Sequence, residues 1–219
     1  IQEILMRLGR NTFLVIALLL PIMAGMGLNF GMVLGAMAGQ LGLIFITDWG
    51  VVGIPGLRLA MIISFPISVF LGWLCGSIMN LAKGREMVTG FILAFFMNGL
   101  YMMIILYAMG SIIPVFSPEL LLSRGYGIRN VIGLDGVRQC LDNLIPLKIA
   151  GLNIPVFSFL SIAAVSVGIV WFRKTKMGQD MRAAGQDRGV SSSAGLHVEQ
   201  TRILAIIIST VLAGIGQII

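Results

Sequence analysis

Five long runs of this chain contain no Asp, Glu, Lys or Arg. A helix needs about 20 apolar residues to cross a bilayer, and these runs reach or approach that length. Only 11% of the residues are charged, whereas a soluble domain has about 25%. The chain is therefore expected to be an all-α polytopic membrane protein, a helical bundle with at least five membrane segments. The runs are residues 11–47, 59–82, 87–118, 149–172 and 203–219.

Basic residues indicate which ends of these segments face the cytoplasm. Residues 173–202 carry six Lys or Arg against three acids, which places them inside by the positive-inside rule. The short turn at Lys83 to Arg85 and the N-terminal Arg7 and Arg10 are assigned to the same side. By elimination, residues 110–154 face outside.

The first run is too long for one ordinary span. Residues 11–47 would extend about 55 Å as a straight helix, against a hydrocarbon core of about 30 Å. We expect a first span near 11–28 and then a broken or re-entrant segment over 29–47, bending near Asn29 or Gly31 and returning to the outer side by Asp48. The alternative is two ordinary spans with the N-terminus outside. Backbone that is not helical at membrane depth must be covered by protein or line a cavity.

These considerations give one transmembrane domain over residues 1–219. Because the chain begins without Met and ends inside an apolar run, we expect it to be a fragment that lacks C-terminal spans. An external segment over 110–154 and a cytoplasmic segment over 173–202 connect the spans. The external segment is expected to form a gate on the bilayer surface, a dock for a binding protein or a plain loop, with a possible amphipathic turn at 137–145. The spans are placed at about 11–28, 29–47, 57–82, 87–109, 155–172 and 203–219.

Glycine recurs every four residues in "GLNFGMVLGAMAG". Spacing of four places these glycines on nearly one face of a helix. In lipid, small residues stabilise helix pairs because they let two backbones approach closely. The stripe is expected to be a helix-packing seam formed by Gly27, Gly31, Gly35 and Gly39.

The most informative stretch is "TKMGQDMRAAGQDRGVSSSAGLHVEQTRILAIIISTVLAGIGQ". It resembles the coupling region of permease subunits of bacterial ABC importers, in the family that serves branched-chain amino acids, ribose-type sugars and nucleosides. Gly185 and Gly195 have the ten-residue spacing of that family, although Ser191 stands where alanine is usual. "GLNFGMVLGAMAGQ" and "GREMVTGFILAFFMNGLYMM" are similar to earlier parts of the same family. The matching positions are Thr175, Gly178, Met181, Arg182, Ala183, Ala184, Gly185, Ala194, Gly195 and the span from about Ile203.

The resemblance implies a location in the bacterial inner membrane and several partners. Two permease chains, identical or homologous, would form the pore, and a solute-binding protein would deliver substrate from outside. ATP-binding cassette subunits, carrying ATP and Mg²⁺, would dock on a cytoplasmic knob. In that knob, a first short helix would be closed by Gly185 in the left-handed conformation and a second would begin at the N-cap Asp187. Small side chains would let the partner approach, while Arg182 and Arg188 would reach its acidic groups or carbonyls. The residues expected to couple to the ATPase are Gly178, Met181, Arg182, Ala183, Ala184, Gly185, Ala194 and Gly195.

The solute is expected to be polar and nearly neutral, because no charged residue lies within a span to receive an ion. Amide and aromatic side chains favour a simple sugar or a nucleoside. A branched-chain amino acid is the alternative, because helix ends at the break could bind a zwitterion. The residues expected along the path are Asn29, Gln40, Phe95, Phe96, Asn98 and Tyr101.

Other function classes lack their characteristic residues. His197 has no Cys or Glu at ligand spacing, and no phosphate-loop lysine or nucleophile elbow is present, so we expect neither a metal site nor catalytic residues. A membrane transferase would need clustered acids or histidines at the membrane edge, and an ion-coupled channel or carrier would need charges within its spans. The chain has no cluster of basic residues with interleaved aromatic residues, so nucleic acid is not expected as a partner. Membrane lipid is the expected surrounding medium.

Overall fold

The computed structural model describes residues 11–117, 120–123, 125–128, 146–149 and 152–218. Within these residues the elements are helical apart from one short hairpin, which confirms the all-α class. Three helices are long and apolar enough to cross a membrane, namely Gly53–Leu81, Glu86–Ala108 and Val198–Ile218. In chain order the helices are α2 (Leu19–Met23), α3 (Met32–Asp48), α4 (Gly53–Leu81), α5 (Glu86–Met103), η1 (Ile104–Ala108), α6 (Val156–Phe172), α7 (Lys176–Gln186), α8 (Arg188–Ser193) and α9 (Val198–Ile218), with strands β1 (Pro146–Ile149) and β2 (Leu152–Pro155) before α6.

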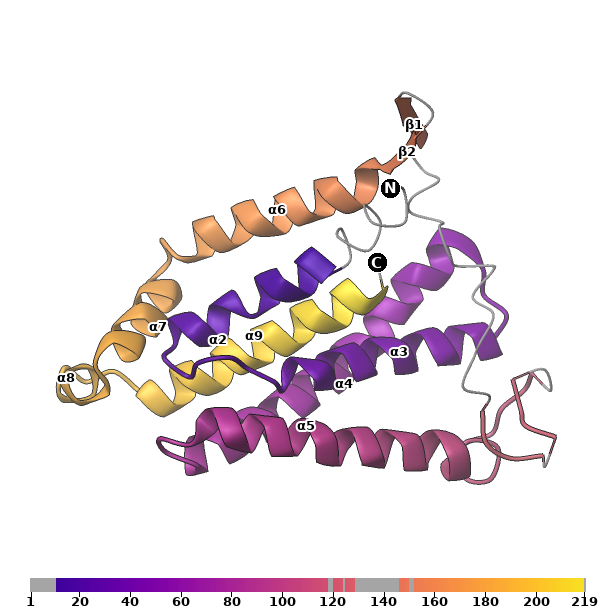
Figure 1. Cartoon of the computed structure of the whole chain (residues 1–219), viewed down its shortest axis with the longest axis horizontal. Helices are drawn as coiled ribbons and strands as arrows, with labels where there is room; N and C mark the ends of the chain where they lie inside the picture. Colours follow the sequence, from indigo (N-terminus) through magenta and orange to yellow (C-terminus); the bar gives the residue numbers. More distant parts are fainter. Residues whose placement is uncertain (1–10, 118–119, 124, 129–145, 150–151, 219) are drawn as a thin grey trace.

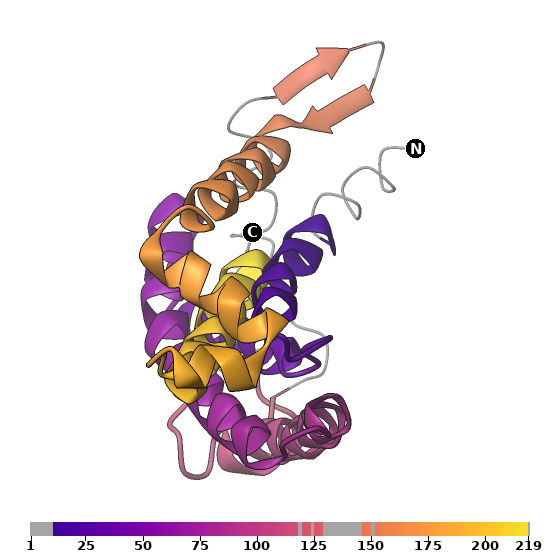
Figure 2. The same cartoon turned by 90° about the vertical axis from the view of Figure 1, so that its left-hand side faces the viewer.

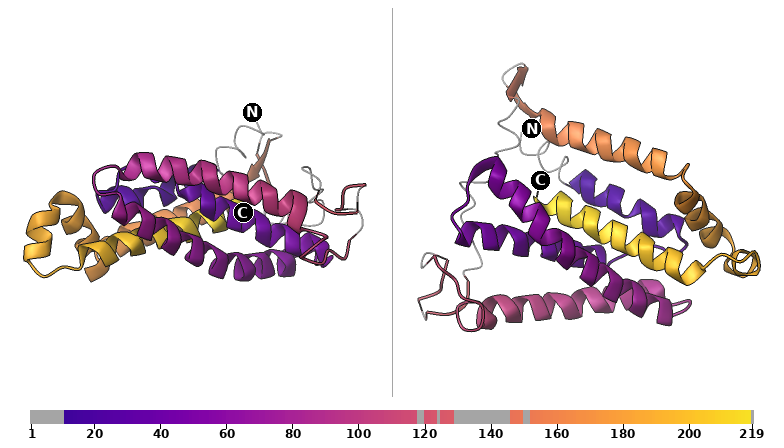
Figure 3. Two further views of the ribbon diagram at one scale, coloured as in Figure 1. Left: turned by 90° about the horizontal axis from the view of Figure 1, so that it is seen from below. Right: turned by 180° about the vertical axis from the view of Figure 1, so that it is seen from behind.

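Helix α9 lies at the centre of the bundle, against α3 and α4 (Figures 1 and 3). Half of its most apolar 18-residue stretch is buried, compared with 33% of the corresponding stretch in α4 and 17% in the helix that begins at Glu86. Its buried face carries small residues such as Ala205, Ala213 and Gly214, which allow its neighbours to approach. Helix α5 therefore presents most of its apolar surface outward, as a helix in contact with lipid does.

The two ends of the bundle differ. Helices α7 and α8 form a compact protrusion at one end, which we call the knob (residues 176–195) (Figures 1 and 2). The turn between α4 and α5 lies at this knob end, where Gly84 adopts φ +84°. The turn between α3 and α4 and residues 110–117 lie at the opposite end.

The first apolar run is broken, as the sequence predicts, but the break comes earlier than expected. A helix covers Asn11–Met23, and the chain then unwinds until α3 begins at Met32. Gly25 and Gly27 both adopt φ +70°, a conformation that favours glycine. Gly27 therefore lies outside any helix, and the four-residue spacing does not form one helical stripe of four glycines.

The orientation expected for this run is wrong. Gly25 contacts Gly185 of α7, so the end of the first helix lies at the knob end. Sequence reasoning placed the knob inside and residue 28 outside, and these two placements are incompatible. The first helix ends at the knob, and the positive φ of Gly25 and Gly27 lets the chain turn back there into α3. The structure favours the alternative of two antiparallel segments joined by a turn at the knob end. Arg7 and Arg10, which prompted the other orientation, lie outside the described residues.

Helix α3 is not a re-entrant segment, because it does not return to the side of the membrane from which it starts. It is one uninterrupted helix of 17 residues that runs from the knob end to the opposite end (Figure 1). There the Asp48 carboxylate accepts hydrogen bonds from the backbone N–H groups of Phe116 (2.8 Å) and Ser117 (2.9 Å). These bonds attach the start of the segment after α5 to the end of α3.

Two helix boundaries also shift from the expected spans. Helix α4 begins at Gly53 rather than near residue 57, and Pro55 in its first turn occupies a position where no backbone N–H is needed. Helix α9 begins at Val198 rather than near residue 203, so Arg202 falls inside it. The amphipathic turn expected at 137–145 lies outside the described residues.

Candidate functional site

The knob is built from two short helices with polar caps. Thr175 caps α7: its Oγ1 accepts a hydrogen bond from the N–H of Gly178 (3.3 Å). Asp187 caps α8, as expected, with its carboxylate accepting from the N–H groups of Gly189 (2.8 Å) and Val190 (3.1 Å). Gly195 follows α8 with φ +82°, where a residue with a side chain would be strained. These caps stabilise two helices that would be too short to form alone.

One face of the knob packs against the bundle. Met181 and Ala184 are fully buried, and Met181 belongs to a core cluster with Leu20 and Ile206. Gly178 is buried against the carbonyl group of Phe172. The expectation that Ala184 lets a partner approach is therefore wrong, because its methyl group faces the interior of the chain itself.

Gly185 does not end α7 in the left-handed conformation, since the helix continues to Gln186. Its backbone lies against the turn after the first helix. A Cβ at Gly185 would collide with the carbonyl oxygen of Met23 and would come within 3.0 Å of the nitrogen of Gly25. Glycine is thus needed here for close backbone approach rather than for a positive φ.

The other face of the knob is open. Arg182, Ala194 and Gly195 are exposed, and Ala183 is partly exposed. Two apolar side chains that were not among the expected coupling residues are also exposed. They are Met177, with an exposed fraction of 40%, and Val190, with an exposed fraction of 67%. The outward face therefore combines small, apolar and basic groups.

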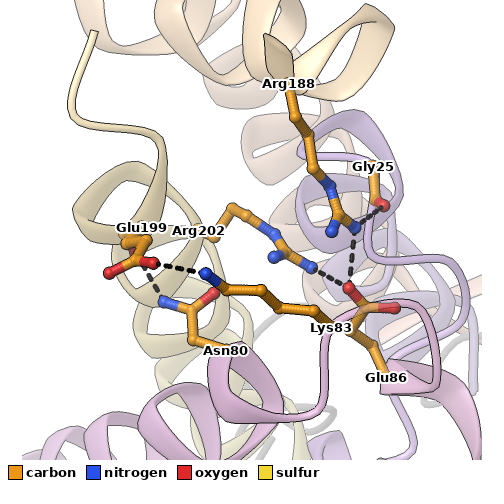
Figure 4. Close-up of polar contacts among 7 residues, drawn as sticks. All are labelled: Gly25, Asn80, Lys83, Glu86, Arg188, Glu199 and Arg202. Carbon is orange, nitrogen blue, oxygen red and sulfur yellow. Dashed lines mark hydrogen bonds and ion pairs between the residues drawn. The ribbon is translucent and has the colours of Figure 1, made fainter. Parts of the chain in front are cut away.

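A cluster of charged side chains lies between the knob and the bundle (Figure 4). One oxygen of Glu86, at the start of α5, accepts hydrogen bonds from Nη2 of Arg188 (2.7 Å) and Nη2 of Arg202 (2.8 Å). The same nitrogen of Arg188 also donates to the carbonyl oxygen of Gly25 (3.3 Å). Arg188 is expected to reach acidic groups or carbonyls of a partner, but the carboxylate and the carbonyl that it meets in the structure both belong to its own chain.

A second ion pair flanks this cluster. Lys83 and Glu199 lie 3.3 Å apart, with exposed side-chain fractions of 71% and 68%. The side-chain amide of Asn80 donates to the backbone carbonyl of Glu199 (2.8 Å). Because an exposed ion pair contributes little to stability, the buried Glu86 pairs matter more for holding this end together.

Sequence reasoning missed Glu86 and Arg202 as partners. A signal was present, since Glu86 is the only acid between Asp48 and Glu119 and stands at a helix start opposite the most basic segment. What the sequence could not supply was the start of α9 at Val198, which turns Arg202 inward.

Asn29 lies in the unwound turn and is fully buried. Its side-chain oxygen accepts a hydrogen bond from the N–H of Gly31 (2.9 Å), while its Nδ2 has no partner among the described residues. The neighbouring Phe30 makes an edge contact with Phe91 of α5 (5.3 Å between ring centroids), and Phe91 makes another with Phe95 (4.7 Å). The turn therefore contains a buried, unpaired amide donor, and the next residue, Phe30, begins a row of aromatic rings.

The remaining residues expected along a path lie on α3 and α5 but do not gather around Asn29. Gln40 and Asn98 are exposed, as are Phe95 and Phe96. Tyr101 packs farther from the knob, in a cluster with Ile44 and Ile105. Within the described residues only Phe95 is linked to the turn, through Phe91 and Phe30.

Three glycines of the predicted seam lie at close approaches between helices. A Cβ at Gly35 would collide with the carbonyl oxygen of Thr210, and one at Gly39 would come within 2.6 Å of the carbonyl oxygen of Gly214, both on α9. Gly31 faces the sulfur of Cys75 on α4. Gly27 has open space around the position of a Cβ, so nothing packs against it there.

The described residues contain no group of three or more His, Cys, Asp or Glu side chains that could hold a metal ion. The acids at 180, 187 and 199 do not converge: Asp187 caps α8 and Glu199 pairs with Lys83.

A known protein family matches nearly the whole chain. The model of a family described as "Branched-chain amino acid transport system / permease component" matches residues 2–219. Comparisons with curated proteins and with solved structures give no match.

Proposed function

Because the chain belongs to the family of branched-chain amino acid transport system permease components, we propose that it is the membrane-spanning subunit of an ATP-driven importer. As an ABC-type permease, it is a multi-pass protein of the inner membrane and a transport subunit. Partners of this family are ATPase and solute-binding proteins in general. Import of a particular solute by alternating access, and the contacts that drive it, are our proposal.

The observation that carries the proposal is the knob. It is capped at both helix starts, anchored by buried Met181 and Ala184, and open on its outward face. We propose that an ATP-binding subunit docks on that face, with Val190 and Met177 in its groove and Arg182 at the rim. Apolar side chains in the centre and charges at the edge are typical of protein interfaces. ATP and Mg²⁺ would then be bound by the partner, and this chain would respond to their hydrolysis through the knob.

At the opposite end we propose the dock for a solute-binding protein. The bonds from Asp48 to Phe116 and Ser117 fix the first part of the external segment against α3. A second permease chain, identical or homologous, would complete the pore. The outward-facing α5 and α6 are free to meet it or lipid.

For the solute, a simple sugar or a nucleoside is favoured. The turn contains the unpaired Asn29 amide and Phe30, which contacts Phe91 of α5 and through it Phe95. The charged side chains beside the turn are paired with one another, Glu86 with Arg188 and Arg202. Amides bind hydroxyl and base edges, and aromatic rings stack on sugars and bases. A branched-chain amino acid remains the second candidate, because the start of α3 at the break could receive its carboxylate.

Docking can be tested by copurifying the full-length protein with its ATPase from the host. Val190→Glu places a charge at the centre of the proposed interface and should abolish copurification and uptake. Val52→Glu is the matched control for copurification, since Val52 is also exposed (64%) but precedes α4 at the end opposite the knob. If Val190→Glu retains the ATPase and imports solute, the docking proposal is wrong.

The solute can be identified by uptake of labelled simple sugars, nucleosides and branched-chain amino acids into proteoliposomes that contain the whole transporter. We expect uptake only with ATP inside the vesicles and only for one class. Uptake without the ATPase would favour an ATP-independent channel or carrier. Asn29→Leu should weaken uptake of a sugar or nucleoside, because it removes the amide donor, while Asn98→Leu on exposed α5 serves as the control.

A further inference from the structure

The knob and the unwound turn meet at Gly25. The backbones of Gly25 and Gly185 approach so closely that a Cβ on Gly25 would come within 2.8 Å of the Cα of Gly185. Arg188, on α8, reaches past this contact to the carbonyl oxygen of Gly25 (3.3 Å). Both helices of the knob therefore touch the same residue of the turn.

Arg188 also joins the turn to the rest of the bundle. Its donor nitrogen lies 2.7 Å from the carboxylate of Glu86, which in turn holds Arg202 of α9 at 2.8 Å (Figure 4). A single nitrogen, Nη2, donates both bonds, and the planar guanidinium group fixes the directions of its N–H groups, whereas the ammonium of a lysine rotates freely on a flexible stem. Four segments, namely the turn, α5, α8 and α9, thus meet around one carboxylate.

The three charged side chains differ in how firmly they are held. The side chains of Glu86 and Arg202 are only 8% and 3% exposed, whereas that of Arg188 is 39% exposed. Glu86 and Arg202 therefore form a buried pair that is costly to separate, and Arg188 is the member that can move with the knob.

The turn itself can transmit a displacement. Gly25 and Gly27 adopt positive φ, and the backbone hydrogen bonds of the turn lie at its two ends, as from the N–H of Met26 to the carbonyl oxygen of Pro21 (3.1 Å). It leads directly to Asn29, whose amide is buried and unpaired, and to Phe30 against Phe91.

We propose that Arg188 is the positioning residue that transmits knob movement to the turn at residues 24–31, with Glu86 as the fixed point. When the knob shifts, Arg188 and the Gly25–Gly185 contact pull the turn with it, and Asn29 and Phe30 change their position relative to α5. This inference rests on the proposed function, in which the ATPase moves the knob. It adds that the force reaches the first helix and α3 directly, through the turn that joins them, in addition to reaching α6 and α9, which flank the knob in the chain.

The test uses spin-label distances in the full transporter with its ATPase. Labels at Leu28→Cys in the turn and at Gln186→Cys at the end of α7 are each paired with Val52→Cys at the opposite end. Cys140 is replaced by Ser, while Cys75 is buried and can stay. Distances are compared without nucleotide and with ATP, Mg²⁺ and vanadate.

In the otherwise unchanged protein, both distances should change with nucleotide. In Arg188→Ala, the change from 186 to 52 should persist while the change from 28 to 52 becomes clearly smaller, because only the Gly25–Gly185 contact still joins the turn to the knob. Uptake per ATP hydrolysed should fall roughly tenfold, which is a typical coupling between two sites. The variant is expected to fold because Glu86 keeps Arg202 as its partner. Lys176→Ala removes one exposed positive charge from α7 and should change neither distance response.

The two proposals fail in different ways. If the label at 186 does not respond to nucleotide in the unchanged protein, the proposed function is wrong and this inference falls with it. If the label at 186 responds and the label at 28 still responds fully in Arg188→Ala, the inference alone is wrong.

Discussion

Glu86 holds two arginine side chains at once, and both come from more than 100 residues away in the chain. A buried carboxylate needs a positive partner, and a buried arginine needs a negative one, because each loses its water on folding. Arg202 depends on this contact most, since its Nε has no hydrogen-bond partner among the described residues. Neutralising Glu86 therefore leaves a charge in the protein interior.

We expect Glu86→Gln to destabilise the protein by about 3 kcal/mol, because it removes one partner of a buried ion pair. Thermal unfolding in detergent should show this as a clear drop in Tm. Glu199→Gln is the matched control: its partner Lys83 is exposed, so the expected loss is under about 1 kcal/mol. Equal losses in the two variants would contradict the special role of the buried pair.

At the scale of elements, small residues determine how closely the helices approach. Gly35 and Gly39 of α3 lie against the backbone of α9, and Gly72 and Gly76 of α4 lie against Ile207 and Ile203 of the same helix. In lipid, where burying apolar surface gives no gain, this close contact is a main source of helix association. The cost of glycine in a helix is thereby offset by interhelical contact.

Gly35→Ala should destabilise the bundle by about 1–3 kcal/mol, because the added methyl group would force α3 and α9 apart. Gly99→Ala on α5 is the control, as a Cβ there meets nothing within 4 Å. The control should be neutral or slightly stabilising, since alanine favours helix. The comparison can be made by denaturant unfolding in the same detergent. A neutral Gly35→Ala would show that the contact is looser than described.

The knob depends on its caps in a similar way. Asp187→Ala removes the acceptor for the N–H groups of Gly189 and Val190, so α8 should lose about 1 kcal/mol. Hydrogen exchange at those two amides should become faster, while Asp180→Ala, within α7, should leave them unchanged. Unaltered exchange in Asp187→Ala would mean that α8 is held by other contacts.

At the scale of the whole molecule, the structure fixes which segment ends share a side. The turn at residues 24–31, the turn between α4 and α5, and the knob lie at one end, while Asp48 and residues 110–117 lie at the other. This arrangement brings the turn between the first helix and α3 to the knob, whereas the sequence predicts that this turn lies at the opposite end.

Cysteine accessibility in oriented vesicles can test this topology. With a thiol reagent that does not cross membranes, Leu28→Cys should label from the same side as Gln186→Cys, and Val52→Cys from the other. Leu28 and Val52 are both exposed, so a lack of reaction would not stem from burial in the bundle. Labelling of Leu28→Cys from the side of Val52→Cys would support the original expectation instead.

The sequence by itself determined the class of the molecule and its family. Uncharged runs of membrane length require helices because backbone groups in lipid must bond within their own segment. The length of residues 11–47 required a break for the same reason. The cap at Asp187 was also readable, since it depends on residues that are neighbours in the chain.

Only the tertiary structure decided where the break lies, which way the first helix runs and which charges pair. Gly25 and Gly185 each look like ordinary turn or cap glycines in the sequence, but their shared contact arises from two segments 160 residues apart. The meeting of Arg188, Glu86 and Arg202 likewise depends on how three helices approach. Local rules describe a residue and its neighbours, whereas these features result from packing between segments that only the folded bundle brings together.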